Sequence, residues 1–326
     1  MTREVEHEIT IGAPAAEVYR LIAEVENWPR IFPPTVHVDR VGDGPAGGPA
    51  DDAAGGADGV TEERIRIWAT ANGEAKNWTS RRTLDPRART ITFRQEVSAP
   101  PVASMGGTWI IEPLGGDSCR VRLLHDYRAV GDDPEKLEWI DRAVDRNSRS
   151  ELAALKRNVE LATGAAELTL SFQDSVEING SAKDAYDFVN EAGLWKERLP
   201  HVAEVSLTED SPGLQVLRMD TLAKDGSTHT TESVRVCFPH HRIVYKQTTL
   251  PALMALHTGY WLFEEDASGV TTATSQHTVV LNTANIAKVL GEDAGVLEAR
   301  DFVRSALSTN SRATLGYAKE YAEARR

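Results

Sequence analysis

The chain is 326 residues long and carries a formal net charge of −13. This length predicts two domains of about 150 residues, each large enough to bury a full hydrophobic core. The acidity argues against a nucleic-acid partner, which would require a basic face. No apolar run approaches the roughly 18 residues of a membrane span, and the first residues are too polar for a signal peptide. We therefore expect a cytoplasmic protein that uses neither nucleic acid nor membrane.

The chain has two cysteines, Cys119 and Cys237, and they lack the spacing of a metal site. We expect one free thiol in each domain, no metal and no cofactor. Basic side chains gather between residues 81 and 94. They form either a solvated strand face or a patch that receives an acidic partner.

Each half of the chain begins with the same order of predicted elements. An alternating strand comes first, over residues 5–11 and again over 168–178. A helix follows, with Pro14 at its start in the first half and Ser181 as the predicted N-cap in the second. A tryptophan-containing segment ends the first helix, because the prolines between residues 29 and 34 cannot continue it.

The rest of each half is a run of strands followed by one long helix. Residues 42–59 are mostly Gly, Ala, Asp and Pro, which predicts a disordered loop. Several alternating strands come next in each half. The long helices are predicted over residues 134–162 and roughly 293–324, and residues 163–166 form a short linker.

This order of elements is typical of an α+β fold. A curved antiparallel sheet can wrap around the last helix and leave a pocket between them. We predict two tandem domains of this kind, residues 1–162 and 167–326.

The two halves repeat the same functional side chains at matching places. A tryptophan follows the first helix, Ser-x-Arg stands in a central strand, and a Trp and a His follow 16 residues apart. The first copies are Trp28, Ser80, Arg82, Trp109 and His125, and the second copies are Trp195, Ser233, Arg235, Trp261 and His277. This agreement indicates a duplicated domain.

Period-two alternation sorts the strand over residues 76–84 into two faces. One face is wholly polar and must meet water. The other face, which carries Trp78, Ser80 and Arg82, is therefore predicted to point inward.

The same argument applied to residues 121–127 turns His125 and Tyr127 inward. In the second half Ser233 and Arg235 share a face, but the neighbouring valines make the opposite face apolar as well. Burial of that opposite face at a contact between the domains would explain the pattern.

An inward arginine is costly unless an acceptor meets its donors. One explanation is a structural ion pair with Glu96 or another acid, and single buried histidines or tryptophans are more often ordinary core residues. The repetition of Arg, Ser, Trp and His favours instead an aromatic-walled pocket that contains one fixed cation. Such a pocket suits a flat, carbonyl-rich ligand.

These motifs resemble those of the polyketide aromatase/cyclases of bacterial type II polyketide synthases. That family has the helix-grip fold of START and Bet v1 domains, and the resemblance covers both halves, as in the family's didomain branch. The long closing helix is one shared feature. The residues that carry the resemblance are Asn27, Trp28, Pro29, Phe32, Trp78, Ser80, Arg82 and Trp109.

The resemblance implies roles for individual residues. In the family, the arginine that matches Arg82 holds a carbonyl oxygen of the tethered poly-β-ketone, and the matching serine and tryptophans hold and shape the chain. Departures from the family pattern are Thr35 and Lys76, near aromatic positions of single-domain relatives, and Thr231, which replaces the strand tryptophan. The expected catalytic residues are Arg82, Ser80, His125, Tyr127, Arg235, Ser233 and His277, and the expected substrate-binding residues are Trp28, Trp78, Trp109, Trp195, Trp261, Gln95 and Gln247.

The resemblance also implies a reaction. The substrate is a C9-reduced polyketide held as a thioester on an acyl carrier protein, with a ketoreductase among the partners, and the reaction closes and dehydrates the first ring between C7 and C12. Arg82 cannot act as a base, but it can stabilise an oxyanion together with Ser80. His125 is the best candidate for proton transfer, assisted by Tyr127. We expect a monomer that is an internal pseudo-dimer.

Two other functions remain open. The same fold carries lipids and hormones without chemistry, although a carrier pocket is usually more apolar. Alternatively, one domain is catalytic and the other is a scaffold. The lost tryptophan makes the second domain the expected scaffold and the first the expected active domain, and a closed cavity around Arg235 would support this assignment.

Overall fold

The protein divides into two compact units, Met1–Gly164 and Ala165–Arg326. The structure is a computed structural model that describes residues 2–42, 59–71, 73–162, 166–222, 226 and 228–326. Most of the predicted loop, residues 43–58, and most of the predicted linker, residues 163–165, lie outside the described residues.

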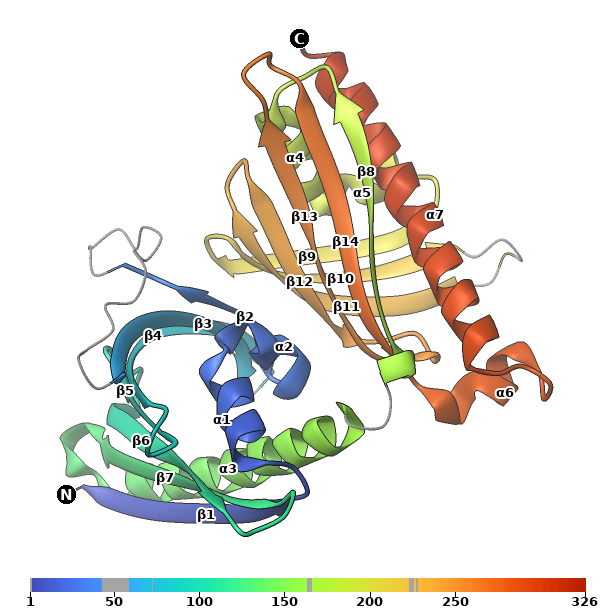
Figure 1. Cartoon of the computed structure of the whole chain (residues 1–326). Helices are drawn as coiled ribbons and strands as arrows, with labels where there is room; N and C mark the ends of the chain where they lie inside the picture. The colour runs from blue at the N-terminus through green and yellow to red at the C-terminus, as the bar shows by residue number, and fades with distance from the viewer. Residues whose placement is uncertain (1, 43–58, 72, 163–165, 223–225, 227) are drawn as a thin grey trace. The chain divides into compact units, whose positions relative to one another are not determined.

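Over the residues that the structure describes, the first unit is one antiparallel sheet of seven strands with three α-helices. In Figure 1 this sheet curves around α1 and α2, and α3 packs beside β1 and β7. The spatial order of the strands is β1-β7-β6-β5-β4-β3-β2. The elements are β1 (Arg3–Ile11), α1 (Ala15–Ala23), α2 (Trp28–Ile31), β2 (Thr35–Arg40), β3 (Thr61–Ala71), β4 (Glu74–Asp85), β5 (Thr90–Gln95), β6 (Val102–Pro113), β7 (Cys119–Ala129) and α3 (Pro134–Ala162).

The second unit repeats this plan. Its sheet has the order β8-β14-β13-β12-β11-β10-β9, and α7 packs along β8 and β14. The elements are β8 (Thr169–Ile178), α4 (Ala182–Asn190), α5 (Trp195–Arg198), β9 (Val202–Ser211), β10 (Leu214–Leu222), β11 (Thr228–Phe238), β12 (Arg242–Thr249), β13 (Met254–Glu265), β14 (Thr271–Leu281), α6 (Ile286–Leu290) and α7 (Val296–Glu323).

The predicted α+β fold of two tandem helix-grip domains is confirmed. The local signals were also correct: α1 begins directly after Pro14, and the Ser181 Oγ accepts a hydrogen bond from the Asp184 backbone N–H at 3.0 Å. The last helix begins at Val296, slightly later than the predicted start near residue 293, with Gly295 as its N-cap, and a separate short helix, α6, precedes it. Among the described residues, no helix is both long and apolar enough to cross a bilayer.

The two long helices cover their sheets with different side chains. The buried face of α3 carries large apolar residues on both sides of Ser148. The corresponding stretch of α7 buries Ser311 and Thr314, and its next buried residues include two alanines, Ala318 and Ala322. Small and polar side chains at the middle of α7 leave room between that helix and its sheet.

The predicted strand faces are also confirmed. Ser80 and Arg82 of β4 are buried, and Trp78 packs against the buried cluster that contains Ile65. The His125 ring lies within 3.4 Å of the Ser148 Oγ on α3, so this side of β7 faces the helix. Cys119 and Cys237 are free and buried.

Candidate active sites in the two domains

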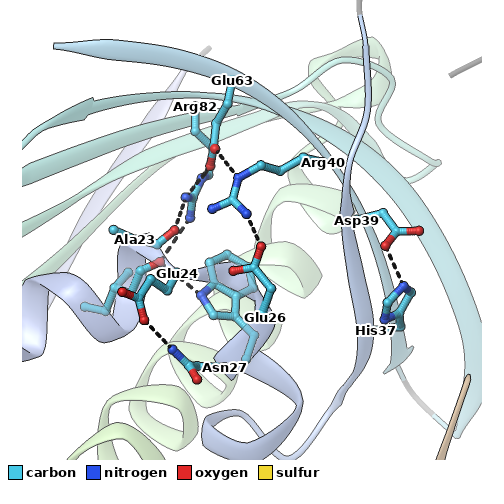
Figure 2. Close-up of polar contacts among 11 residues, drawn as sticks. Ala23, Glu24, Glu26, Asn27, His37, Asp39, Arg40, Glu63 and Arg82 are labelled. Atoms are coloured by element: carbon cyan, nitrogen blue, oxygen red, sulfur yellow. Dashed lines mark hydrogen bonds and ion pairs between the residues drawn. The ribbon is translucent and has the colours of Figure 1, made fainter. Parts of the chain in front are cut away.

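In the first domain, Arg82 is buried and fully engaged by the protein. Its Nε donates to the Glu63 Oε1 at 2.9 Å, and Nη2 also pairs with that carboxylate. Nη1 donates to the Ile22 carbonyl at 3.1 Å and Nη2 to the Ala23 carbonyl at 2.7 Å, at the C-terminal end of α1. Figure 2 shows this arrangement. The guanidinium therefore has a carboxylate that balances its charge and an acceptor for each nitrogen.

The acid that meets Arg82 is Glu63 and not Glu96. Glu63 lies directly opposite Arg82 on the neighbouring strand β3. The Glu96 carboxylate pairs instead with Arg64 and Arg81 on the outer face, because successive residues of a strand point to opposite faces. The structural ion pair with Glu96 or another acid, which the sequence analysis gave as the alternative to a ligand-binding arginine, is therefore present at Arg82, and its acid is Glu63.

The Glu63 carboxylate serves a second arginine as well. The Arg40 Nε donates to the Glu63 Oε2 at 2.8 Å, and Arg40 also pairs with Glu26. These four side chains form a chain of alternating charge (Figure 2). Burial lowers the pKa of Arg82, and the Glu63 charge opposes this change.

Trp28 contacts the same end of α1 as Arg82 does. Its Nε1 donates to the Ile22 carbonyl at 3.0 Å, and the Arg82 guanidinium carbon lies 5.4 Å from the centre of its ring. Phe32 joins Trp28 to Trp109, with ring centroids 5.5 Å and 6.1 Å apart. The predicted aromatic wall of the first domain is therefore present, and it packs in the core clusters of that domain.

The remaining first-domain candidates lie in separate places. Burial lowers the pKa of His125 to about 4, so its ring is neutral near pH 7. The Tyr127 hydroxyl donates to Asp141 at 2.6 Å and lines a groove of about 430 Å³ that none of the other candidates line. The Gln95 Oε1 accepts from the Ser98 hydroxyl at 3.0 Å. Tyr127 is thus held apart from Arg82, whereas His125 faces α3.

Glu151 was missed by the sequence analysis. It lies on α3 three residues after Ser148, the partner of His125, so both project from the same side of the helix. Burial raises the pKa of Glu151 to about 7. The three-residue spacing from Ser148 on the same helix is the signal that could have pointed to this residue.

The second domain holds a cavity of about 130 Å³ between its sheet and α7. Every residue predicted for this domain lines it. Those residues are Arg235, Ser233, His277, Trp195, Trp261 and Gln247. The duplicated pattern thus brings together side chains from five different elements.

Arg235 repeats the position of Arg82 but not its partners. Its Nη2 donates to the Val189 carbonyl at the end of α4 at 2.7 Å, and its guanidinium carbon lies 5.5 Å from the Trp195 ring centre. Nη1 is buried without a hydrogen-bond partner, and within the described part of the chain Arg235 makes no ion pair. The residue opposite it on β10 is Gln215, at the place that Glu63 occupies in the first sheet.

Next to Arg235 the cavity wall carries a chain of hydrogen-bonding side chains. The His277 Nδ1 lies 2.9 Å from both the Tyr245 hydroxyl and the His257 Nε2. On the other side of the ring, its Nε2 lies 2.6 Å from the Ser311 hydroxyl of α7. Burial lowers the pKa of His277 to about 4 and that of His257 well below its usual value, and it raises the pKa of Tyr245. Near pH 7 the two imidazoles are neutral and the phenol is protonated.

Tyr245, His257 and Ser311 were not among the predicted site residues. Alternation along β12 would have placed Tyr245 on the same face as Gln247. Its ring lies across Gly259, where a side chain would clash, because a Cβ there would come within 2.6 Å of the Tyr245 hydroxyl. The presence of a cavity around Arg235 also differs from the closed interior expected of a scaffold domain.

The two sheets, each packed against a long helix with an arginine and a tryptophan buried inside, place the chain in the helix-grip class of proteins. The chain belongs to the family of polyketide cyclases/dehydrases and lipid transport proteins, whose model matches residues 2–160 and 169–323.

Similar proteins match along nearly the whole chain. The granaticin polyketide synthase bifunctional cyclase/dehydratase of Streptomyces virginiae is 56% identical over 313 residues, which span 96% of this chain and 97% of that protein. The actinorhodin polyketide synthase bifunctional cyclase/dehydratase of Streptomyces coelicolor is 44% identical over 322 residues, with 96% and 94% covered. The present chain is accordingly an enzyme, a polyketide cyclase/dehydratase.

Solved structures agree with this assignment. The di-domain ARO/CYC BexL from the BE-7585A biosynthetic pathway is 71% identical with a TM-score of 0.88, covering 99% of this chain and 100% of that one. The di-domain ARO/CYC StfQ from the steffimycin pathway is 32% identical with a TM-score of 0.83, covering 98% and 99%.

Proposed function

We propose that this enzyme folds a C9-reduced poly-β-ketone bound to an acyl carrier protein, closes its first ring between C7 and C12, and dehydrates that ring to an aromatic one. The observation that carries the proposal is the cavity of the second domain, where six residues predicted for a carbonyl-rich ligand line one space. The match to bifunctional cyclase/dehydratases over nearly the whole chain supports the two chemical steps.

The size of the cavity fits one ring. Its volume is about 130 Å³, close to the roughly 150 Å³ of a protein cavity that binds benzene. A whole polyketide would need more space, since drug-sized ligands occupy about 300 Å³ or more. The proposed ligand therefore places its first ring inside and leaves the rest of the chain toward the carrier protein.

The reaction needs an oxyanion site and a proton carrier. In ring closure a base takes a proton from the carbon beside one ketone, and the resulting enolate carbon adds to a second ketone carbon. One C–C bond forms as the π bond of that carbonyl breaks, and the new alkoxide takes up a proton. In dehydration a proton leaves the neighbouring carbon, the C–O bond breaks and water departs. Arg235 suits the anionic oxygen. Tyr245 is a protonated acid, and the neutral His277 can accept a proton.

The first domain offers a second set of groups. Trp28 and Trp109 supply aromatic surface, and His125, Ser148 and Glu151 supply a base, a hydroxyl and a carboxyl on facing elements. Arg82, with all its nitrogens engaged, shapes this interior through the end of α1. We therefore assign chemistry to both domains and reserve the anionic oxygen for the second.

Further parts of the proposal concern partners and location. The enzyme acts in the cytoplasm as a monomer, receives its substrate from the carrier protein, and follows a ketoreductase. We also propose domain boundaries at residues 1–162 and 167–326, as expected from the sequence.

The test is reconstitution with a minimal synthase, with and without the ketoreductase, in which the products of the normal chain, Arg82→Ala and Arg235→Ala are compared. We expect first-ring aromatic products only with the normal chain, and most strongly from the reduced substrate. Arg235→Ala should accumulate uncyclised or undehydrated material. If the enzyme leaves the product mixture of the synthase unchanged, the chain binds polyketide without chemistry and the proposal fails.

A further inference from the structure

The two arginines differ in the residue that lies opposite them on the preceding strand. Glu63 faces Arg82 across β3 and β4, and Gln215 faces Arg235 across β10 and β11. The backbone carbonyl at the helix end and the tryptophan beneath the guanidinium are present in both domains. The exchange of a carboxylate for an amide is therefore the main electrostatic difference around the arginine.

The amide of Gln215 also keeps a nearby acid away from Arg235. Its Nε2 donates to the Glu209 Oε2 at 2.7 Å, and weaker contacts reach Asn190. Its Oε1 is buried without a hydrogen-bond partner. The Glu209 carboxylate thus acts on Arg235 through an intervening amide and not as a contact ion pair.

The cavity contains nothing else that balances this charge. Among the described residues that line it, none is a carboxylate. Three of the lining side chains hold buried polar atoms with no partner: the Arg235 Nη1, the Gln247 Oε1 and the His257 Nδ1. Buried polar atoms are normally paired, so three orphaned ones around one space point to a polar ligand that completes them.

We propose that Gln215 makes the second domain an anion-binding domain, because it leaves Arg235 uncompensated for the enolate or phenolate oxygen of one ring, whereas Glu63 neutralises Arg82 and makes it structural. The ligand class is a single flat ring that carries an anionic oxygen and neighbouring hydrogen-bonding groups. The inference rests on the proposed function only for the natural ligand, a polyketide enolate.

The test is direct binding, without any synthase. Isothermal titration calorimetry of the full chain is carried out with salicylate, a single ring with an anionic oxygen, and with salicylamide, its neutral analogue of similar shape. We expect salicylate to bind at least about tenfold more tightly, the range of a charge-assisted hydrogen bond.

The decisive variant moves the carboxylate without changing net charge. In Gln215→Glu combined with Glu209→Gln, the acid lies opposite Arg235 as in the first domain, and the two side chains can still bond to each other. The preference for salicylate should disappear in this variant and in Arg235→Gln. Gln276→Glu is the matched control, since Gln276 lies on the outer face of β14 and bonds to Ser171; it should keep the preference.

Equal binding of the two probes to the normal chain would overturn the inference, and so would a salicylate preference that survives the double substitution in a chain whose circular dichroism is unchanged. A preference for salicylate that persists in Arg235→Gln would mean that the anion binds elsewhere, and it would also overturn the inference. A chain that shows the expected preference but forms no aromatic product keeps this inference and refutes the proposed function.

Discussion

Glu63 and Gln215 occupy the same register position in the two sheets, each opposite a buried arginine. In the first sheet the pair is a buried salt bridge, and in the second it is an arginine beside an amide. Breaking a buried pair by removing one partner leaves an uncompensated charge, which is far more costly than the net value of the pair. The two domains therefore respond differently to the same kind of substitution.

Glu63→Gln should destabilise the first domain. It leaves both Arg82 and Arg40 without their shared carboxylate. We expect a loss of about 3–5 kcal/mol in the free energy of unfolding, the range for breaking a buried ion pair. Urea unfolding of the full chain, followed by circular dichroism, measures it.

The matched control is Glu26→Gln, which removes the other partner of Arg40. The Glu26 side chain is 60% exposed, and exposed pairs contribute less than about 1 kcal/mol. Equal losses in the two variants would show that Glu63 has no special role.

Stability should fall in mild acid because of the neutral histidine in the second cavity. Burial lowers the pKa of His277 from 6.5 to about 4, so the unfolded chain takes up a proton on this residue before the folded one does. The contribution of His277 to the free energy of unfolding is complete above about pH 6.5 and is lost as the pH falls toward 4. By pH 5 the loss amounts to about 2 kcal/mol. The groups around the ring are Tyr245, His257, Ser275 and Ser311, and Asp174 acts on the pKa in the opposite direction.

The check is the difference in unfolding free energy between about pH 7.5 and about pH 5, which is independent of any constant effect of a substitution. His277→Gln should show a smaller difference than the normal chain. His241→Gln, at an exposed position, should leave it unchanged. If His277→Gln loses as much unfolding free energy in acid as the normal chain does, the effect does not come from His277.

The inward faces of single strands could be predicted from sequence because alternation is local. Ser80 and Arg82 were placed correctly by the all-polar face opposite them, and the duplication extended the placement to Arg235. The partner of each arginine could not be predicted in the same way. Glu63 and Gln215 lie on other strands, and which residue faces an arginine depends on the register between strands.

The open cavity of the second domain could not be predicted from the sequence pattern either. A lost tryptophan at Thr231 indicated a weaker site, yet small side chains at Ser311 and Thr314 open the space beneath it. Cavities depend on the sum of many side-chain volumes from distant elements. The expectation that the first domain does most of the work therefore gives way to a proposal in which both contribute.

Tyr245→Phe is expected to impair water loss selectively. Phe93 stands at the corresponding register position, opposite Arg82, so the substitution gives the second domain the side chain of the first. Loss of a positioned acid should slow dehydration by about 100-fold and should accumulate the cyclised, hydrated product in the reconstituted synthase. Mass spectrometry distinguishes that product by one water.

Tyr186→Phe is the control for Tyr245→Phe. It removes a buried tyrosine hydroxyl of the same domain that bonds to Asn190 and does not line the cavity. Unchanged dehydration in Tyr245→Phe would exclude this tyrosine as the acid.

Glu151 should titrate near neutrality and give the first domain the opposite pH response. Burial raises its pKa from 4.5 to about 7, so the folded chain holds this proton more tightly than the unfolded one. Its contribution is greatest below about pH 4.5 and is lost as the pH rises through 7; we expect about 1 kcal/mol, because part of the side chain meets solvent. In Glu151→Gln this loss of stability between about pH 5 and about pH 8 should vanish, whereas Glu138→Gln, an exposed substitution on the same helix, should retain it.

Glu151→Gln should also flatten the pH dependence of product formation if Glu151 exchanges protons with substrate, since acid–base catalysis is most effective near the pKa of the group. A stability profile identical to that of the normal chain would mean that Glu151 is ionised throughout and cannot serve as the acid.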